Sequence, residues 1–143
     1  MAVATALDKG HSSTANNIVA AAGRVLISAI FILSGISKLA APAATIGYID
    51  AVGLPFAPLA LAAAVAIEVV GGLALIAGFK TRWVAGVLAL FSVVTAIAFH
   101  ANFADQNQFI HFFKNIAITG GLLQVVAFGA GAFSLDAYRR GKI

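Results

Sequence analysis

The chain has 143 residues, of which 62% are hydrophobic and only 10% are charged. Soluble domains carry about a quarter charged residues, so this composition excludes an ordinary water-soluble fold. The net charge of +4 does not indicate nucleic-acid binding, because the basic residues lie at the ends of hydrophobic runs or inside them rather than on one soluble face. The absence of cysteine excludes disulfide exchange, thiolate nucleophiles and cysteine-ligated metal centres.

Four hydrophobic stretches are long enough to cross about 30 Å of hydrocarbon, which takes about 20 mainly apolar residues. They cover residues 18–40, 57–79, 83–100 and 109–128. The first is too long for a signal peptide and contains Arg24, so we expect it to be retained. The sequence therefore predicts an all-α integral membrane protein, a four-helix bundle over residues 18–133. A polar tail (1–17) would precede the bundle, and a basic tail (134–143) would follow it.

The connection between the first two spans has helical features of its own. Pro42 suits a first helical position, and Gly53 followed by Pro55 suits a helix end. Apolar residues recur at helical spacing between them, at Ile46, Ile49 and Val52. We expect a short interfacial helix here, which would either cover the bundle as a lid or simply pack against it.

The basic residues are distributed unevenly between the two ends of the predicted bundle. With four spans, both termini and the hairpin at 79–83 share one side. That side holds Lys9, Lys80, Arg82, Arg139, Arg140 and Lys142. The opposite connections hold Asp50 and Asp105, with only Lys38 and Lys114 at the adjacent helix ends. Because positively charged loops stay inside, we expect a multi-pass protein with both termini in the cytoplasm.

Charged residues inside the predicted spans need an explanation, because each costs about 2.5–3.5 kcal/mol near the bilayer centre. Glu68 lies in the middle of the second span, and Arg24 lies about a turn and a half inside the first. Counting about 1.5 Å per residue from the helix ends, either Arg24 or Lys114 is within reach of Glu68, whereas Lys38 lies farther away. The cations have an alternative, since long side chains can extend to the head groups. Glu68 has none, which favours a polar interior around it.

Polar residues also gather at the predicted outer end of the bundle. They are His100, His111, Lys114, Asn115 and Lys38. Together with Glu68 they would bind a polar head group or relay protons. We expect no metal site, because two histidines with one distant carboxylate lack a ligand spacing and the neighbouring lysine disfavours a cation.

Short motifs in a specific order give the chain a family resemblance. They are Arg24 with Phe31, Gly35 and Lys38; Tyr48 with Gly53-Leu54-Pro55; Glu68 with Gly72; Gly78-Phe79-Lys80-Thr81-Arg82; His100; Phe112-Phe113-Lys114-Asn115; and Gly131-Ala132-Phe133-Ser134-Leu135-Asp136. In these features the chain resembles the DoxX family, and within it the YphA-like bacterial inner-membrane branch. The resemblance implies a four-helix protein of the bacterial inner membrane.

The resemblance also implies a functional expectation, because relatives include membrane subunits linked to quinone-dependent sulfur oxidation and to redox stress. We expect a redox-associated subunit that binds a quinone or similar lipid-soluble molecule and has no redox centre or cofactor of its own. Glu68, Arg24 and His100 would exchange protons. Lys38, His100, His111, Lys114 and Asn115 would bind the head group, with Phe31 and Phe112 packing its ring. As a quinone-linked oxidoreductase subunit, the chain would need a partner to supply electrons.

Two other functions stay open at this point. A small transporter would use the same polar interior as a pathway and would require oligomerisation, since four spans are few for alternating access. A scaffold would anchor a soluble partner enzyme through the basic hairpin or tail. The bilayer is the partner that all three hypotheses share.

Overall fold

The computed structural model describes the backbone of residues 2–141 and the side chains of residues 14–141. In this part of the chain there are six helices and no strand. They are α1 (Ala2–Ala40), α2 (Pro42–Ala51), α3 (Ala57–Ala77), α4 (Thr81–Phe99), α5 (Gln106–Phe128) and α6 (Leu135–Arg139). Four segments are long and apolar enough to cross a membrane: Thr14–Ala40 in α1 and the full lengths of α3, α4 and α5. The predicted all-α bundle of four spans is confirmed.

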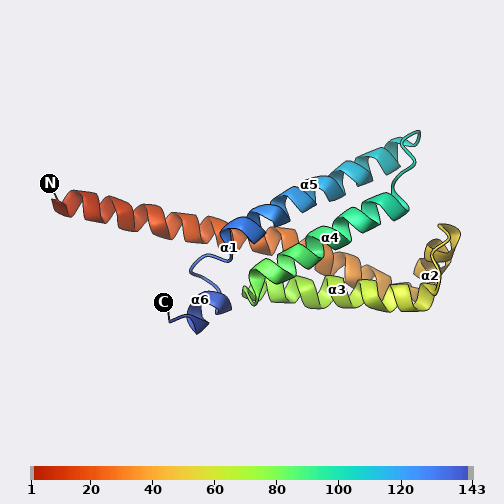
Figure 1. Cartoon of the computed structure of the whole chain (residues 1–143), viewed down its shortest axis with the longest axis horizontal. Helices are drawn as coiled ribbons and strands as arrows, with labels where there is room; N and C mark the ends of the chain where they lie inside the picture. The colour runs from red at the N-terminus through yellow and green to blue at the C-terminus, as the bar shows by residue number, and fades with distance from the viewer. Residues whose placement is uncertain (1, 142–143) are drawn as a thin grey trace.

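α1 is longer than the span expected at 18–40. Its backbone is helical from Ala2, so the segment predicted as a polar tail continues the same helix (Figure 1). The division of the chain into two tails and a membrane domain stays a prediction. The side chain of Lys9 and the whole of Lys142, both used in the orientation argument, lie outside the described residues.

The long helices form an up-and-down bundle in which neighbours in sequence are neighbours in space. α1 packs against α3, α3 against α4, and α4 against α5. The N- and C-termini lie toward the same end (Figure 1). We call this the basic end, because Lys80, Arg82 and Arg139 lie there, and the opposite end, with α2 and the α4–α5 connection, the loop end.

The core of the bundle is narrow, and most large apolar side chains point outward. Leu75, Leu88 and Leu122 are fully buried and meet between α3, α4 and α5. In contrast, Leu26 and Leu90 expose 73% and 67% of their surface. A soluble bundle would bury such side chains, whereas hydrocarbon is a suitable solvent for them. The exposed faces therefore agree with a membrane-spanning bundle.

Two glycines set the close approach of α1 and α3. A Cβ atom added to Gly35 would lie 2.6 Å from Val69 Cγ2, and one added to Gly72 would lie 2.7 Å from Ile32 Cγ1. Any side chain at these positions would push the helices apart. Small residues at such contacts are typical of packed membrane helices.

The predicted short helix between the first two spans is confirmed as α2. Pro42 lies in its first turn, and Gly53 follows its end with a φ of +78°, a conformation that favours glycine. The helix is held by burial of Ile49 against Ala57 and Leu61 of α3. α2 therefore lies across the loop end of the bundle and turns the chain into α3.

Candidate functional site

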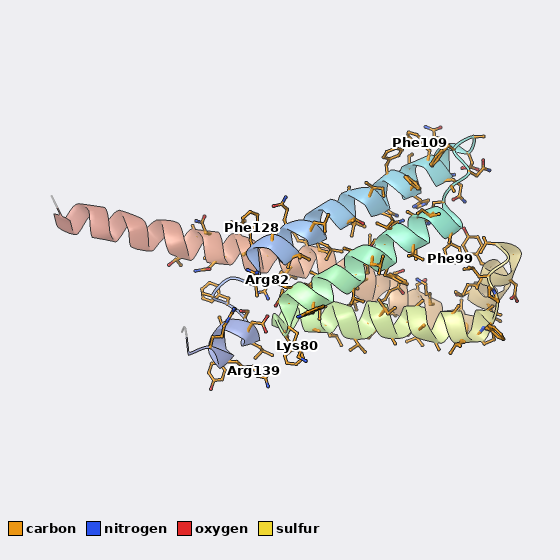
Figure 2. All side chains as sticks on the ribbon, viewed as in Figure 1. Lys80, Arg82, Phe99, Phe109, Phe128 and Arg139 are labelled. Atoms are coloured by element: carbon orange, nitrogen blue, oxygen red, sulfur yellow. The ribbon has the colours of Figure 1, made fainter. Side chains whose placement is uncertain are left out.

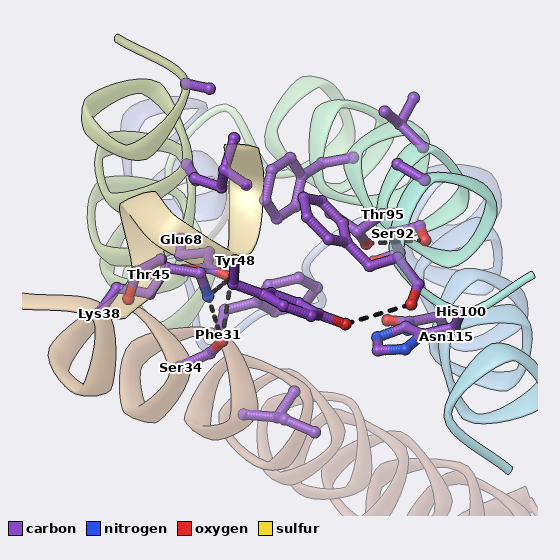
Figure 3. Close-up of a pocket in the computed structure, with 18 of the residues that line it drawn as sticks. Phe31, Ser34, Lys38, Thr45, Tyr48, Glu68, Ser92, Thr95, His100 and Asn115 are labelled. Carbon is purple, nitrogen blue, oxygen red and sulfur yellow. Dashed lines mark hydrogen bonds and ion pairs between the residues drawn. The ribbon is translucent and has the colours of Figure 1, made fainter. Parts of the chain in front are cut away.

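A cavity of about 380 Å³ lies toward the loop end of the bundle, and its lining comes from all five of the helices α1 to α5 (Figure 3). Six residues selected from the sequence line it: Phe31, Lys38, Glu68, His100, Lys114 and Asn115. Three others, Arg24, His111 and Phe112, do not. The structure thus brings together most of the predicted site and leaves the rest outside the cavity.

An ion pair between α1 and α3 forms one charged part of the cavity wall, and Lys114 of α5 is the other. Lys38 Nζ donates hydrogen bonds to Glu68 Oε1 (2.9 Å) and to Ser34 Oγ (2.7 Å). Ser34 Oγ in turn donates to Glu68 Oε1 (3.1 Å). The three side chains form a closed triangle of charge-assisted hydrogen bonds, which are stronger than neutral ones.

The expectation that Glu68 pairs with Arg24 or Lys114 is wrong, because its cation is Lys38. Counting from helix ends assumed that α1 and α3 end at one level. The structure instead places Glu68 beside Gly35, where an added Cβ would lie 3.3 Å from Glu68 Cβ. Lys38 is about one turn beyond Gly35 on the same face of α1. Its long side chain therefore reaches the carboxylate directly.

The Glu68 carboxyl group is buried, and half of it lacks a partner. Only 4% of the residue is exposed, and Oε2 has no hydrogen bond in the described structure. A buried carboxylate oxygen without a donor is costly, which favours binding of a molecule that brings a hydrogen-bond donor. Glu68 is thus chemically the least satisfied side chain of the cavity wall.

α2 contributes polar groups to the cavity from the loop end of the bundle. Tyr48 stacks on Phe99 of α4 with ring centroids 5.4 Å apart, and its hydroxyl donates to the Phe99 carbonyl oxygen (3.3 Å). Thr45 also lines the cavity, although its hydroxyl donates to the carbonyl oxygen of Ala41, the residue just before α2. Through Tyr48, α2 covers the loop end of the cavity and is held to α4.

The two histidines of the loop end are adjacent, but only one lines the cavity. Their ring centroids lie 5.1 Å apart. His100 Nδ1 is 2.8 Å from Gln108 Oε1, and because an amide oxygen only accepts, this nitrogen carries the hydrogen. His111 Nδ1 is 2.8 Å from Lys114 Nζ, and an ammonium only donates, so this nitrogen is an acceptor. His111 therefore lies outside the cavity and contacts two of its lining residues, His100 and Lys114.

The other walls of the cavity are largely apolar. Phe31, Phe91 and Ile118 come from α1, α4 and α5. Ser92 and Thr95 line the wall of α4, but their hydroxyls donate to backbone carbonyls of the same helix, Leu88 and Ser92 respectively. The cavity is thus apolar over much of its wall, and Glu68 Oε2 is the buried side-chain atom of its lining that lacks a partner.

Sequence reasoning missed several polar lining residues: Ser34, Thr45, Tyr48, Ser92 and Thr95. Ser34 was detectable, because it lies four residues before Lys38 and hence on the same helix face. Tyr48 belonged to the family motif but was not assigned to a site. Its contact with Phe99 depends on how α2 folds back over α4, which local spacing does not reveal.

Arg24 lies at the opposite end of the bundle and is almost completely buried. Its guanidinium donates to the carbonyl oxygens of Leu75, near the end of α3, and Phe133, in the segment before α6. The last carbonyls of a helix lack intrahelical partners and attract cations. Arg24 therefore ties α1, α3 and the C-terminal segment together and does not face the cavity.

Within the described part of the chain no group of three or more histidine, aspartate or glutamate side chains is arranged to hold a metal ion. The cavity offers two ammonium groups, a carboxyl group, an imidazole and an amide next to aromatic walls. Such an arrangement suits a mainly apolar molecule with a hydrogen-bonding head group.

Four apolar helices around a partly polar chamber define a small multi-pass membrane protein. A family model described as DoxX matches residues 19–101. The chain is also similar to "Inner membrane protein YqjF" of Escherichia coli (strain K12), with 40% identity over 79% of this chain and 85% of the relative. A further relative, "Inner membrane protein YphA" of the same organism, is 32% identical over 79% of this chain and 84% of its own length.

The chain belongs to the DoxX family. Its four spans and these relatives make it a multi-pass protein of the inner membrane. No solved structure gives a significant match to the chain. The expected family is thereby confirmed.

Proposed function

We propose that the cavity binds a lipid-soluble small molecule with a carbonyl-bearing head group, such as a quinone, and that the protein serves as a redox-associated membrane subunit. The observation that carries the proposal is the Lys38–Glu68 pair in the wall of a largely apolar chamber of about 380 Å³. Pockets of about 300–1,000 Å³ are typical of small-molecule sites. Lys38 would donate a hydrogen bond to a head-group oxygen.

The way into the cavity also supports a ligand from the lipid phase. α1 and α5 approach closely near Gly121, where an added Cβ would lie 3.1 Å from Ile27 Cδ1. Beyond this contact the two helices diverge toward the loop end (Figure 1). The lining includes Ile30 and Val94, which remain 38% and 54% exposed. The chamber therefore borders the region that acyl chains would occupy.

Quinone reduction consumes two electrons and two protons, and oxidation of the quinol releases them. Glu68 and His100 would exchange the protons with the head group, because both line the chamber and both can change protonation state. A redox partner subunit or a second substrate would exchange the electrons. Arg24 is not assigned a part in this exchange, since its guanidinium lies outside the cavity.

The packing below the cavity favours binding over transport. Leu75, Leu88 and Leu122 fill the bundle between the chamber and the basic end, and none of them is exposed. A continuous pathway would need these side chains to move apart. We therefore retain transport as an outcome of the test rather than as the proposal.

A direct binding measurement tests the proposal. The full chain, purified in mild detergent, would be titrated with a short-chain quinone, and the bound fraction followed by calorimetry. We expect saturable binding that Glu68→Gln and His100→Ala weaken by about ten-fold or more, which corresponds to about 1.4 kcal/mol. Asp50→Asn is the matched control, because Asp50 lies on the exposed surface of α2 outside the cavity.

Unchanged affinity in both cavity variants would refute the proposed site. Mass spectrometry of the purified protein is a second experiment that assumes no particular ligand, since it identifies any co-purifying lipids, quinones and protein subunits. Proton or solute flux into liposomes that depends on Glu68 would instead favour a transporter. Co-purification of a soluble enzyme that is indifferent to Glu68→Gln would favour a scaffold.

A further inference from the structure

A second hollow, of about 320 Å³, lies at the basic end of the bundle. It is formed by the start of α4, the α5–α6 connection and α6, and the leucine core separates it from the cavity described above. Its lining contains four cationic side chains and one acidic one: Lys80, Arg82, Arg139, Arg140 and Asp136. Figure 2 shows Lys80, Arg82 and Arg139 gathered at this end, away from Phe99 and Phe109.

The one acidic side chain of this hollow, Asp136, accepts hydrogen bonds from residues at the start of α4. Asp136 Oδ1 accepts from the Lys80 N–H (2.8 Å). Its Oδ2 accepts from the Thr81 N–H (2.8 Å) and the Thr81 hydroxyl (2.7 Å). Asp136 thus caps α4 and forms no ion pair within hydrogen-bonding distance of the surrounding cations. Among the described side chains, the only such ion pair is Lys38–Glu68, at the other end.

The cations are held close to one another by other contacts. Arg139 lies over the Phe79 ring (5.2 Å to its centroid), and Arg140 Nε donates to the Asp136 carbonyl oxygen (2.9 Å). Arg82 lies beside Gly129, where an added Cβ would be 3.3 Å from Arg82 Nε. Gly129 has a φ of +82° and no side chain, which leaves room for the guanidinium. The hollow therefore carries a local excess of positive charge.

We propose that this hollow binds the phosphate group of an anionic phospholipid. A guanidinium can form paired hydrogen bonds to phosphate oxygens, and basic pockets near the ends of membrane helices suit such head groups. Two aromatic side chains beside the hollow identify the source as a lipid rather than a soluble phosphate. Trp83 in its lining is 81% exposed and Phe128, next to Gly129, is 79% exposed. Such aromatic residues lie at the interface, where they would contact the glycerol and acyl part of the same molecule.

Trp83 provides a reporter for the test, because it is the single tryptophan of the chain. The full protein would be reconstituted in phosphatidylcholine vesicles that contain an equal fraction of brominated phosphatidylglycerol or brominated phosphatidylcholine. Bromine quenches tryptophan fluorescence at short range. We expect stronger quenching by the anionic lipid, and salt should reduce the difference.

Charge variants make the assignment specific. Loss of one cation should lower the preference for the anionic lipid by about five-fold, because each cation near a membrane surface contributes about 1 kcal/mol. Arg82→Gln with Arg139→Gln should therefore remove most of the preference. The matched control, Arg82→Lys with Arg139→Lys, should keep most of it. If the glutamine double variant does not fold, Arg82→Gln alone and the salt dependence of the wild type test the same point.

Several outcomes would overturn the proposal. They are equal quenching by both lipids, a preference that survives the glutamine variants, or displacement of the anionic lipid by millimolar inorganic phosphate, which would indicate a soluble anion site. The test does not involve Glu68 or His100. Its failure would therefore leave the proposed quinone site untouched, and the reverse also holds.

Discussion

Lys38 and Glu68 show how a charged pair is kept among membrane-spanning helices. Removing two charges from water costs several kcal/mol each, and only good geometry and additional hydrogen bonds compensate for it. Ser34 supplies one such bond by donating to Glu68 Oε1. The Lys38 side chain retains 25% exposure and the Glu68 side chain 6%, so the cation is the better solvated partner. The carboxyl group therefore depends more strongly on the pair.

A double-mutant cycle tests this dependence. We expect Lys38→Met to destabilise the protein by about 2–4 kcal/mol, because it leaves the Glu68 carboxyl group buried without a cation. Adding Glu68→Gln to Lys38→Met should recover part of that loss. Reversible unfolding of the four proteins in mixed detergent gives the coupling energy, and additive effects would show that the pair does not stabilise the fold.

Arg24 illustrates a buried charge with a structural role. Its side chain bridges the end of α3 and the segment before α6 through two carbonyl oxygens. We expect Arg24→Gln to lower the free energy of unfolding by about 1.5–3 kcal/mol, the usual contribution of a hydrogen bond to a charged group. Quinone affinity of the folded variant should stay within about two-fold of wild type, since Arg24 lies outside the cavity. A selective loss of binding without a loss of stability would contradict this interpretation.

At the scale of elements, the C-terminal helix closes the α3–α4 hairpin. Ser134 caps α6 by accepting from the Ala137 N–H (3.1 Å), and Asp136 in that helix caps α4. The Asp136 N–H also donates to the Gly78 carbonyl oxygen (2.9 Å). α6 therefore supplies the N-terminal groups of α4 with partners that the hairpin itself lacks.

This cap predicts a pH dependence. Burial alone would raise the pKa of the Asp136 carboxyl, but hydrogen bonds from Thr81 and Lys80 outweigh it and lower the pKa below its ordinary value of 3.8. A lowered pKa means that the carboxylate stabilises the folded state above that ordinary value, and that the stabilisation is lost as the pH falls through the folded-state pKa. Asp136→Asn should cost about 1–2 kcal/mol at pH 7.

Thermal unfolding of the wild type and of Asp136→Asn between pH 3 and pH 7 checks this prediction. The difference between the two proteins should begin to shrink as the pH falls below the ordinary value of 3.8, because the unfolded wild-type chain then binds a proton that the folded carboxylate does not. A difference that stays constant over the whole range would mean that the Asp136 charge does not contribute to the cap.

The contact between α1 and α3 depends on the glycines Gly35 and Gly72 as well as on the Lys38–Glu68 ion pair. We expect Gly35→Ala to destabilise the bundle by about 1–3 kcal/mol, because the new methyl group would meet the stiff Val69 side chain. It should also displace Glu68 and weaken ligand binding. Gly120→Ala in α5 is the matched control, since an added Cβ there meets nothing within 4 Å. Equal stability of the two variants would contradict the close contact.

At the scale of the whole molecule, the absence of cysteine makes topology directly measurable. Single cysteines at Tyr138 and Ala101 would place a thiol at the basic end and in the α4–α5 connection, and both positions are exposed. If positive charge sets the orientation, a membrane-impermeant maleimide should label Ala101→Cys in intact spheroplasts. It should label Tyr138→Cys only after the membrane is opened. The opposite pattern would reverse the predicted orientation.

The sequence by itself determined the bundle, because hydrocarbon imposes a minimum length of apolar helix that four stretches satisfy. It also indicated several of the charged and polar residues that line the cavity, since a carboxyl group such as Glu68 in the middle of a span requires polar partners. The tertiary structure decided which side chains are the partners of Glu68. The relative level of α1 and α3 follows from the folding of α2 and from close packing at Gly35, neither of which a count from helix ends contains. For the same reason Lys38 became the partner of Glu68, and Arg24 became a structural residue at the opposite end.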